Sequence, residues 1–528
     1  MGDKYFKAIS INKILFILCF TFCITLISNL NTVHLRFVQG ASIFRMIYEF
    51  YFVWLLCFIF LLCFYWNNIL LKFATVTYFL ISVFSIYLYY VFGLTIEYRL
   101  LINIVNTENS EIWSFLTPSA ILLLLLTITI ISYFCLKVKF THNFELRKKR
   151  NIAYIISAII IIILLHLFMH KFNTIKFAYS PFTFIQSSFK VLQNRSVSRL
   201  ESIVKANDIT NLNKQPTDIV LIIGESANVY HQQYHGYKRN TNEFTKKLKN
   251  IVYFNKVTSC WTATAYSVPC MLSSLSQREF LKNYPPAKHN VAEVFAKAGF
   301  VTYWISKVGL FRDNLRDRIL SDFKYSQYAE KALISTPLTE HDDIHYDIGT
   351  LKVYNKEFDP VNNKNKYNFI VFHSKGSHAR YIQRYPKSFD YYKKPNNNSE
   401  DQMDNEYDNS LRYSDYVYAK IVNLFKNRRA LILFFSDHGD SLKSDHSGVI
   451  YHGTPYDKAP KEQTHISAWA WASDKWLKDP NNARKYKLIK EKSNKSISHD
   501  WVFHSLIDCA DIKISSNLVN KKLSLCSK

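Results

Sequence analysis

Three side chains that could hold a divalent metal ion follow predicted buried strands at widely separated points of the sequence. Glu225 follows the apolar run DIVLIIG, and Asp437 and His438 follow the run ALILFFS. Two carboxylates and an imidazole suit Zn²⁺ or Mn²⁺. His378 and His452 are two more candidates at loop positions. Each residue alone could be a turn residue, a helix cap or a hydrogen-bonded loop histidine, but their joint placement after strands favours one metal site.

The segment TSCWTATAYSVPC, residues 258–270, offers a nucleophile for that metal. Three protein ligands leave one coordination position open, and a threonine hydroxyl in that position would have a lowered pKa. The following SVPCMLSSLS is expected to be helical with Pro269 near its first turn, so a hydroxyl just before it would suit a phosphate. The pattern does not choose between Thr262 and Thr264.

The elements that must position these residues alternate between strands and helices from about residue 216 onward. Further strands are expected in NIVYFNKV, VTYWISKV and YNFIVFHSKG. Short apolar runs separated by helical segments predict a mostly parallel sheet with helices on both faces. In such α/β folds the functional groups gather beyond the carboxyl ends of the strands. The polar stretch KKPNNNSEDQMDNEYDN, residues 393–409, is expected to be a loop.

The first third of the chain is expected to cross a membrane. Its apolar runs are long enough to span a bilayer near residues 13–32, 44–66, 70–94, 118–136 and 152–169. Lysines before the first run and six basic residues in KVKFTHNFELRKKR face the cytoplasm under the positive-inside rule. Counting the crossings places everything after about residue 170 outside the cytoplasm.

The chain is therefore expected to have three parts. Residues 1–170 form a five-helix transmembrane domain, and residues 216–528 form the α/β domain. Between them, residues 171–215 have the helical spacing of an amphipathic bridge along the membrane surface, although an ordinary surface helix fits equally well.

Charge and cysteine content agree with an extracytoplasmic domain. The formal net charge of +25 suggests a partner with phosphates, and the location outside the cytoplasm favours a membrane surface over nucleic acid. Cys260, Cys270, Cys509 and Cys526 lie outside the predicted spans, and an even number of cysteines suits an oxidising compartment. Three disulfide connectivities are open, and the local pairing of Cys260 with Cys270 is the simplest.

Together these features resemble the phosphoethanolamine transferases of Gram-negative inner membranes, which include lipid A-modifying enzymes of polymyxin resistance. The resemblance covers essentially the whole chain and implies a sulfatase/alkaline phosphatase-like periplasmic domain. The motifs IGES, SCWTATAYSVPCM, SDHGDSL, GSH and YHGTPYDKAPKEQTH carry it. The resemblance implies that the metal ligands are Glu225, Thr264, Asp437 and His438, that Thr264 is the nucleophile, and that His378 and His452 serve in catalysis and substrate binding.

The loop NIVNTENSE fits a pattern that this family associates with its lipid substrate. The pattern falls on Asn103, Thr107 and Glu111.

The chain also departs from the family pattern. Trp261 stands where a glycine is usual, and Ala379 and Arg380 replace a Gly-Pro pair after GSH. A family segment rich in cysteine and bearing a lysine is absent, and Lys307 or Arg312 could supply its positive charge. These departures leave the reaction class intact and make the acceptor less certain.

The resemblance implies a monomeric, multi-pass inner-membrane enzyme. It would transfer phosphoethanolamine from phosphatidylethanolamine to lipid A through a covalent threonine intermediate. One tightly bound Zn²⁺ is expected, and a second is left open. Another envelope acceptor, such as a core sugar, a glucan or a protein, would fit the same chemistry. The alternatives are a phosphoglycerol transferase of the lipoteichoic acid type, a sulfatase or phosphodiesterase, and a catalytically inactive scaffold or sensor.

Overall fold

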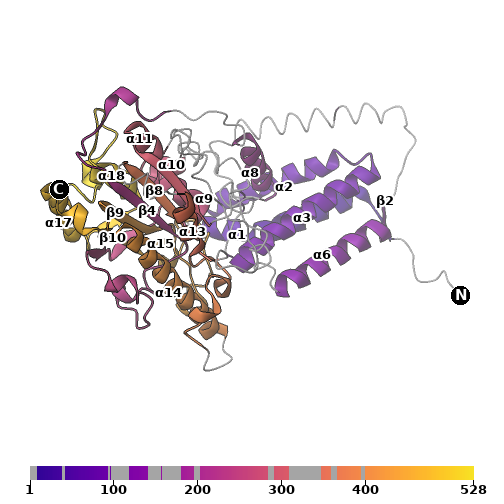
Figure 1. Ribbon diagram of the computed structural model, residues 1–528. Helices are drawn as coiled ribbons and strands as arrows, with labels where there is room; N and C mark the ends of the chain where they lie inside the picture. The colour runs from indigo at the N-terminus through magenta and orange to yellow at the C-terminus, as the bar shows by residue number, and fades with distance from the viewer. Residues whose placement is uncertain are drawn as a thin grey trace. The chain divides into compact units, whose positions relative to one another are not determined.

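A computed structural model of the protein describes residues 9–38, 42–92, 118–140, 180–194, 202–282, 290–307, 346–357, 366–393 and 399–528, together with residues 96, 101 and 156 (Figure 1). The chain divides into two compact units. One comprises Met1–Ile102 and Ile112–Gln193, and the other comprises Asn103–Glu111 and Asn194–Lys528.

The first unit is helical and apolar. In its described part, four helices are long and apolar enough to cross a membrane. These are α1 (Lys13–Val38), α2 (Ile43–Leu62), α3 (Asn68–Phe92) and α6 (Pro118–Lys137). They coincide with the first four predicted spans, whereas the fifth, near 152–169, lies outside the described residues except for Ile156. The described part therefore holds four of the five expected helices.

Three smaller elements belong to the part of the first unit that the structure describes. Strands β1 (Ile9–Ile11) and β2 (Val138–Phe140) pair in parallel. Helix α8 (Phe182–Asn194) exposes Phe189 and Leu192. It falls within the segment expected to be an amphipathic bridge.

The second unit is built on a six-stranded sheet in the order β5-β10-β9-β4-β8-β7. Its strands are β4 (Asp218–Gly224), β5 (Ile251–Tyr253), β7 (Val301–Ser306), β8 (Asn368–His373), β9 (Ala430–Ser436) and β10 (Ala468–Ala472). Strands β7, β8, β4 and β9 are parallel to one another, and β10 runs antiparallel to both its neighbours. The central strands are continuous apolar runs because both faces of the sheet are covered.

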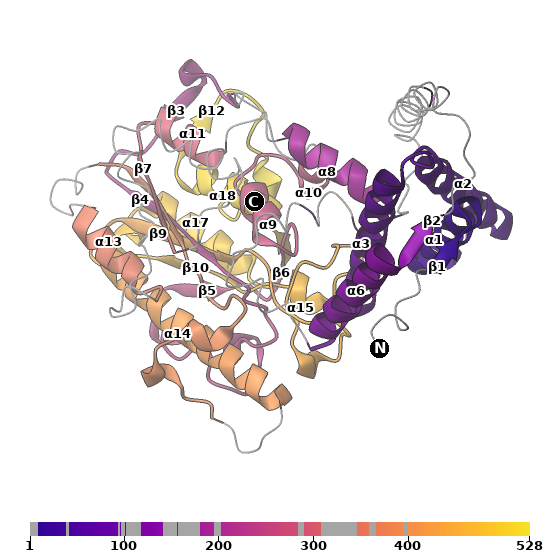
Figure 2. The ribbon, with the colours of Figure 1, turned by 90° about the vertical axis from the view of Figure 1, so that its right-hand side faces the viewer.

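Helices cover both faces of this sheet (Figure 2). On one face lie α13 (Gly349–Glu357) and α14 (Ser399–Phe425), whose Tyr354, Val417 and Phe425 join the sheet core. Helices α11 (Val291–Lys297) and α18 (Asp500–Cys509) lie over the other face. On that side the Phe295 ring stacks on the Phe369 ring with centroids 4.1 Å apart.

The remaining elements of the second unit are short. The strands are β3 (Ile209–Asn211), β6 (Lys256–Thr258), β11 (Ser496–Ser498) and β12 (Ile512–Ile514). The helices are α9 (Thr264–Met271), α10 (Gln277–Lys282), α15 (Lys461–Thr464), α16 (Asp474–Leu477) and α17 (Pro480–Glu491). The 3₁₀ turns are η2 (Ala206–Asp208), η3 (Gln233–His235), η4 (Thr245–Lys247), η7 (Tyr381–Gln383), η8 (Lys387–Phe389), η9 (Lys443–Asp445) and η10 (Lys521–Leu523).

Two local predictions were wrong. Residues 399–409 are not a loop, because α14 begins at Ser399 and its polar first turns lead into a buried stripe that includes Tyr407 and Leu411. Pro269 is also not near the first turn, because α9 begins at Thr264 and Pro269 lies inside the helix. Thr264 is therefore the first residue of α9 rather than a residue before it.

Candidate active site

Two neighbouring strands bring the candidate ligands together. Strands β4 and β9 are parallel and in register, with Gly224 opposite Ser436. The next residues along the chain are therefore neighbours at the same edge of the sheet: Glu225 after β4, and Asp437 and His438 after β9.

Thr264 completes a cluster with these residues. Its Oγ1 hydroxyl donates to Glu225 Oε2 over 3.1 Å and lies 3.3 Å from His438 Nε2. His438 Nε2 also lies 3.2 Å from Glu225 Oε1 and 3.4 Å from Asp437 Oδ2. The other ring nitrogen of His438, Nδ1, is 3.1 Å from the Gly439 carbonyl oxygen. That contact leaves Nε2 as the nitrogen that faces the cluster.

The electrostatics of this cluster are those of two buried carboxylates beside one imidazole. Glu225, Asp437 and His438 are almost completely excluded from solvent. Burial and the Glu225 charge raise the pKa of Asp437 to about 7. Burial acts to lower the pKa of His438, but the Asp437 and Glu225 carboxylates override it and raise that pKa to about 10. Burial also acts to raise the pKa of Glu225, yet the hydrogen bond and charge of His438 hold it well below its usual value.

The cluster fits a divalent cation. One ligand atom each from Glu225, Asp437 and His438 lies within 4.8 Å of the others. Asp437 Oδ2 is buried and has no hydrogen-bond partner among the described residues. His438 Nε2 lies 3.4 Å from it, beyond the usual length of a hydrogen bond, and a divalent cation held by the three side chains would supply a closer positive charge. Carboxylate oxygens with one imidazole are a donor set that Zn²⁺ accepts.

Close backbone packing fixes the position of Glu225. Gly376 follows β8 with a φ of 45°, and a Cβ at this position would lie 2.8 Å from the Glu225 carbonyl oxygen. Only glycine allows this approach without strain. The Ser377 amide donates to the same carbonyl oxygen over 3.0 Å. Ser226, at a positive φ of 57°, donates its hydroxyl to Glu225 Oε1.

The disulfide loop gives its two threonines different roles. Cys260 and Cys270 form a disulfide. The Thr262 hydroxyl is buried and donates to the Thr454 carbonyl oxygen over 2.5 Å. Thr264 is the one side chain from residue 259 to residue 272 that is not buried. The sequence pattern did not choose between Thr262 and Thr264, but the fold gives them different environments. The Thr262 hydroxyl holds the loop, and the Thr264 hydroxyl faces Glu225 and His438.

Trp261 packs inside the loop. It is 5% exposed, and its ring stacks on Tyr456 with centroids 5.9 Å apart. The Tyr266 ring lies 5.6 Å away on a tilted plane. Trp261 therefore supports the loop from within.

His378 and His452 lie beside the candidate metal ligands. The His452 ring centroid is 4.3 Å from that of His438 and 5.5 Å from that of His378. His452 Nδ1 is 2.7 Å from Asp440 Oδ1, and the Tyr381 hydroxyl donates to Asp440 Oδ2 over 2.8 Å. His438, Asp440 and His452 form a second group with a geometry that could hold a metal ion.

Burial and the nearby Lys375 charge hold the pKa of His378 well below its usual value, so this imidazole is neutral.

Sequence reasoning missed three residues that position the site: Asp440, Tyr381 and His499. Asp440 could have been noticed as the second aspartate of the run SDHGD. The Cys260 amide donates to His499 Nδ1 over 3.0 Å, and His499 Nε2 donates to the Ser436 carbonyl oxygen over 2.9 Å. His499 thus connects the disulfide loop to the end of β9. No sequence motif indicated this role of His499.

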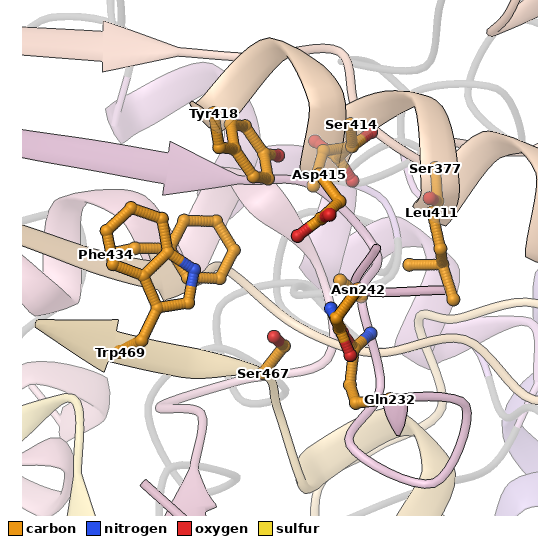
Figure 3. A pocket seen from close by; sticks show the side chains of 12 residues that line it. Gln232, Asn242, Ser377, Leu411, Ser414, Asp415, Tyr418, Phe434, Ser467 and Trp469 are labelled. Atoms are coloured by element: carbon orange, nitrogen blue, oxygen red, sulfur yellow. The ribbon is translucent and has the colours of Figure 1, made fainter. Parts of the chain in front are cut away.

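Glu225 is one of the residues that line a small cavity. Figure 3 shows this cavity from close by. Asp415 and Tyr418 line it from α14, and Trp469 lines it from β10. The Ser377 hydroxyl at its wall is buried and has no hydrogen-bond partner among the described residues. Thr264 is not part of its lining. The cavity therefore suits ordered water rather than the reacting groups.

Four candidate residues are not described. Asn103, Thr107, Glu111 and Arg312 lie outside the described residues. Lys307 follows β7 and is half-buried. Burial lowers the pKa of the Lys307 amine.

Two family profiles match the chain. A profile described as Sulfatase matches residues 217–512, and a profile described as Phosphoethanolamine transferase EptA/EptB matches residues 53–196.

Two curated relatives are named as phosphoethanolamine transferases. The Kdo(2)-lipid A phosphoethanolamine 7''-transferase of Escherichia coli (strain K12) is 27% identical over 327 residues, which cover 60% of this chain and 55% of that protein. The chain thus spans about half the length of that relative. The phosphoethanolamine transferase EptA of the same strain is 25% identical over 452 residues, covering 80% of this chain and 79% of that one.

Solved structures agree with the fold. The integral membrane protein lipooligosaccharide phosphoethanolamine transferase A from Neisseria meningitidis has a TM-score of 0.69 at 19% identity and covers 98% of both chains. The C-terminal periplasmic domain of EcEptC from Escherichia coli, in complex with Zn, has a TM-score of 0.52 at 22% identity. It covers 62% of this chain and 90% of that one.

Proposed function

Because the chain belongs to the phosphoethanolamine transferases of the sulfatase superfamily, we propose that it transfers phosphoethanolamine from phosphatidylethanolamine to lipid A. The observation that carries the proposal is the Thr264 hydroxyl, which lies within 3.3 Å of both Glu225 and His438 at the start of a helix. A hydroxyl so placed is oriented for attack on phosphorus, and the first amides of α9 favour an anion there.

The transfer has two steps. In the first, Thr264 Oγ1 bonds to the phosphorus of phosphatidylethanolamine and the bond to the glycerol oxygen breaks. The hydroxyl proton passes to the bases of the site, diacylglycerol leaves with a proton, and phosphoethanolamine stays on Thr264. In the second step an acceptor oxygen bonds to phosphorus, the bond to Thr264 breaks, and the threonine recovers its proton.

The residues around Thr264 have distinct tasks. Glu225 Oε2 accepts the Thr264 hydrogen bond and so directs the oxygen lone pairs outward. His452, held at Nδ1 by Asp440, is placed to protonate the departing glycerol oxygen. His378 is neutral and can donate a hydrogen bond to a phosphoryl oxygen.

Zn²⁺ is the proposed cofactor, with Glu225, Thr264, Asp437 and His438 as its ligands. When bound, it would lower the pKa of the threonine hydroxyl and offset negative charge on the phosphoryl oxygens. The relative solved in complex with Zn supports this choice. His438, Asp440 and His452 are the residues available for a second ion.

The proposed location is the inner membrane of a Gram-negative bacterium, with the catalytic unit in the periplasm. The apolar helices α1, α2, α3 and α6 and the two disulfides of the second unit support it. Within this proposal, Asn103, Thr107 and Glu111 contact the donor lipid, and the enzyme acts as a monomer.

The intact mass of the full-length protein after incubation with phosphatidylethanolamine tests the function. The wild type should gain the mass of one phosphoethanolamine group, whereas Thr264→Ala should gain nothing and should not modify lipid A. Thr262→Val is the matched control, because it removes a buried loop hydroxyl and should still form the adduct. An adduct that persists in Thr264→Ala contradicts the nucleophile.

Two further measurements test the rest of the proposal. An adduct formed from phosphatidylglycerol instead would favour phosphoglycerol transfer. Metal analysis of the purified protein should find at least one stoichiometric Zn²⁺.

A further inference from the structure

Arg380 occupies an unusual position beside the active site. It lies two residues after His378, between β8 and η7, and its side chain is half-buried. Its backbone is left-handed, with a φ of 63° and a ψ of 55°. Glycine adopts this conformation far more readily than arginine. The loop therefore holds a long cationic side chain at a position where the backbone alone would favour glycine.

The Arg380 guanidinium has no hydrogen bond or ion pair among the described residues. Four other partly buried arginines of the same unit form ion pairs: Arg239 with Asp408, Arg412 with Glu243, Arg428 with Asp218, and Arg429 with Asp479. A fifth, Arg384, donates to the carbonyl oxygens of His378 and Ala379. A half-buried guanidinium without an anion loses solvation and gains nothing in return. Within the described part of the chain, Arg380 therefore differs from these arginines in leaving its charge available to an external anion.

Its neighbours place Arg380 at the rim of the site. The adjacent Tyr381 donates to Asp440, and its ring lies 6.1 Å from that of Tyr451, which precedes His452. Burial and the Asp440 charge raise the pKa of the Tyr451 hydroxyl, and the Arg380 charge opposes that rise. Arg380 therefore lies in the loop between His378 and the residue that holds Asp440, at the edge of the candidate site.

The chemistry of the two substrates indicates which of them Arg380 meets. Phosphatidylethanolamine carries one phosphate, which must lie at Thr264, and a cationic amine, which a guanidinium repels. The anion for Arg380 must then belong to the acceptor. The nearby Ile382 and Ile450 are 57% and 39% exposed, so apolar surface flanks the cation, as an amphiphilic acceptor requires.

We propose that Arg380 determines acceptor specificity by binding an anionic group of the acceptor, separate from the oxygen that receives phosphoethanolamine. The inference rests on the proposed function and deepens it. A guanidinium suits this task because it pairs with a phosphate through two parallel hydrogen bonds. An acceptor with a second phosphate is then used more efficiently than the same lipid with only one.

The test separates the two half-reactions of the full-length enzyme in detergent. The first measurement is the rate of adduct formation from phosphatidylethanolamine without acceptor, and the second is the KM for lipid A bearing either two phosphates or one. For Arg380→Gln we expect adduct formation within about twofold of wild type. Its KM for the lipid with two phosphates should be at least tenfold higher, and its KM for the lipid with one phosphate should change less than threefold.

Companion variants distinguish charge from conformation. Arg380→Gly relieves the left-handed backbone and should lose the same preference for two phosphates, whereas Arg380→Lys should keep part of it. Arg484→Gln, which removes an exposed arginine on α17, should behave as wild type.

The results that overturn the inference are specific. An Arg380→Gly enzyme that retains the preference, or an Arg380→Gln enzyme slowed equally with both lipids, contradicts it. If the wild type forms no adduct, the proposed function fails. If the wild type forms adduct but uses both lipids equally, only the role of Arg380 fails.

Discussion

Side chains of the same type have different properties in this site. Thr262 and Thr264 are two residues apart, yet the Thr262 hydroxyl is buried against a carbonyl oxygen and the Thr264 hydroxyl faces the candidate metal ligands. His438 and His378 also diverge. Two carboxylates raise the pKa of His438 to about 10, whereas burial and Lys375 hold that of His378 well below its usual value. Local environment, and not residue type, assigns each role.

Asp440 is expected to act through His452. Asp440→Asn removes the charge that orients the imidazole, so kcat for transfer should fall about 10- to 100-fold with little change in the KM for the lipid substrates. Tyr381→Phe keeps the ring but removes the hydrogen bond to Asp440, and its loss should be smaller. Steady-state kinetics with both variants checks this order. A Tyr381→Phe enzyme slower than Asp440→Asn would contradict it.

At the scale of elements, the site depends on how closely loops approach the ends of strands. Gly376, after β8, contacts the backbone of Glu225, after β4. The disulfide loop is held from two sides, by His499 and by the Gly453 amide, which donates to the Thr262 carbonyl oxygen over 2.7 Å. The ligand geometry is therefore set by contacts between segments far apart in the sequence.

Gly376→Ala should disable the enzyme. The new Cβ would lie 2.8 Å from the Glu225 carbonyl oxygen at a positive φ, so Glu225 must shift. We expect a loss of stability of about 1–3 kcal/mol and a fall in adduct formation of at least tenfold. Gly236→Ala is the matched control, because its φ is 99° but nothing lies within 4 Å of the new Cβ. The control should lose stability without losing activity, as measured by chemical unfolding and intact mass.

Removing the first disulfide should affect both stability and activity, whereas removing the second should affect stability alone. They close short loops, with sequence separations of 10 and 17, and each should stabilise the fold by about 3 kcal/mol through loop entropy. Replacing Cys260 and Cys270 by serine should lower both the unfolding free energy and the rate of adduct formation, because the loop carries Thr264. Replacing Cys509 and Cys526 should lower only the unfolding free energy. Equal activity losses in both double variants would refute a special role for the first disulfide.

At the scale of the whole molecule, buried histidines make the second unit sensitive to acid. Burial lowers the pKa of His373 and of His499 to about 4. Both are therefore neutral in the folded protein at a pH where the unfolded chain would already be protonated. Their stabilising contribution is complete above about pH 6.5 and is lost as the pH falls toward 4.

The predicted loss is on the order of 3 kcal/mol for each histidine between pH 7 and pH 4. Asp415, whose pKa burial raises to about 6, acts in the opposite direction, so the comparison must be between variants. His499→Asn cannot titrate and should show a shallower decline of unfolding free energy than wild type over this range. Unfolding curves at pH 7, 5.5 and 4 measure the two slopes, and identical slopes would show that His499 does not contribute.

The sequence by itself determined four of the five expected apolar helices, the mainly parallel sheet and the position of Glu225, Asp437 and His438 just after its strands. These features depend on local hydrophobic patterns and on motifs such as SDHGD, which can be recognised in the sequence without knowledge of tertiary contacts. The same patterns misassigned residues 399–409, because a polar helix start resembles a loop until its buried stripe is known. Strand β10 carried no such signal and was not predicted.

Only the tertiary structure showed the different environments of Thr262 and Thr264, joined His452 to Asp440, and left Arg380 without a partner among the described residues. Each depends on long-range contacts: Thr262 is held by Thr454, and Glu225 approaches Gly376 from another strand. Sequence spacing encodes which face of an element a residue occupies, but not which distant segment will meet it. The two threonine hydroxyls differ for this reason, because Thr262 is buried and bonded to the Thr454 carbonyl oxygen whereas Thr264 lies beside Glu225 and His438.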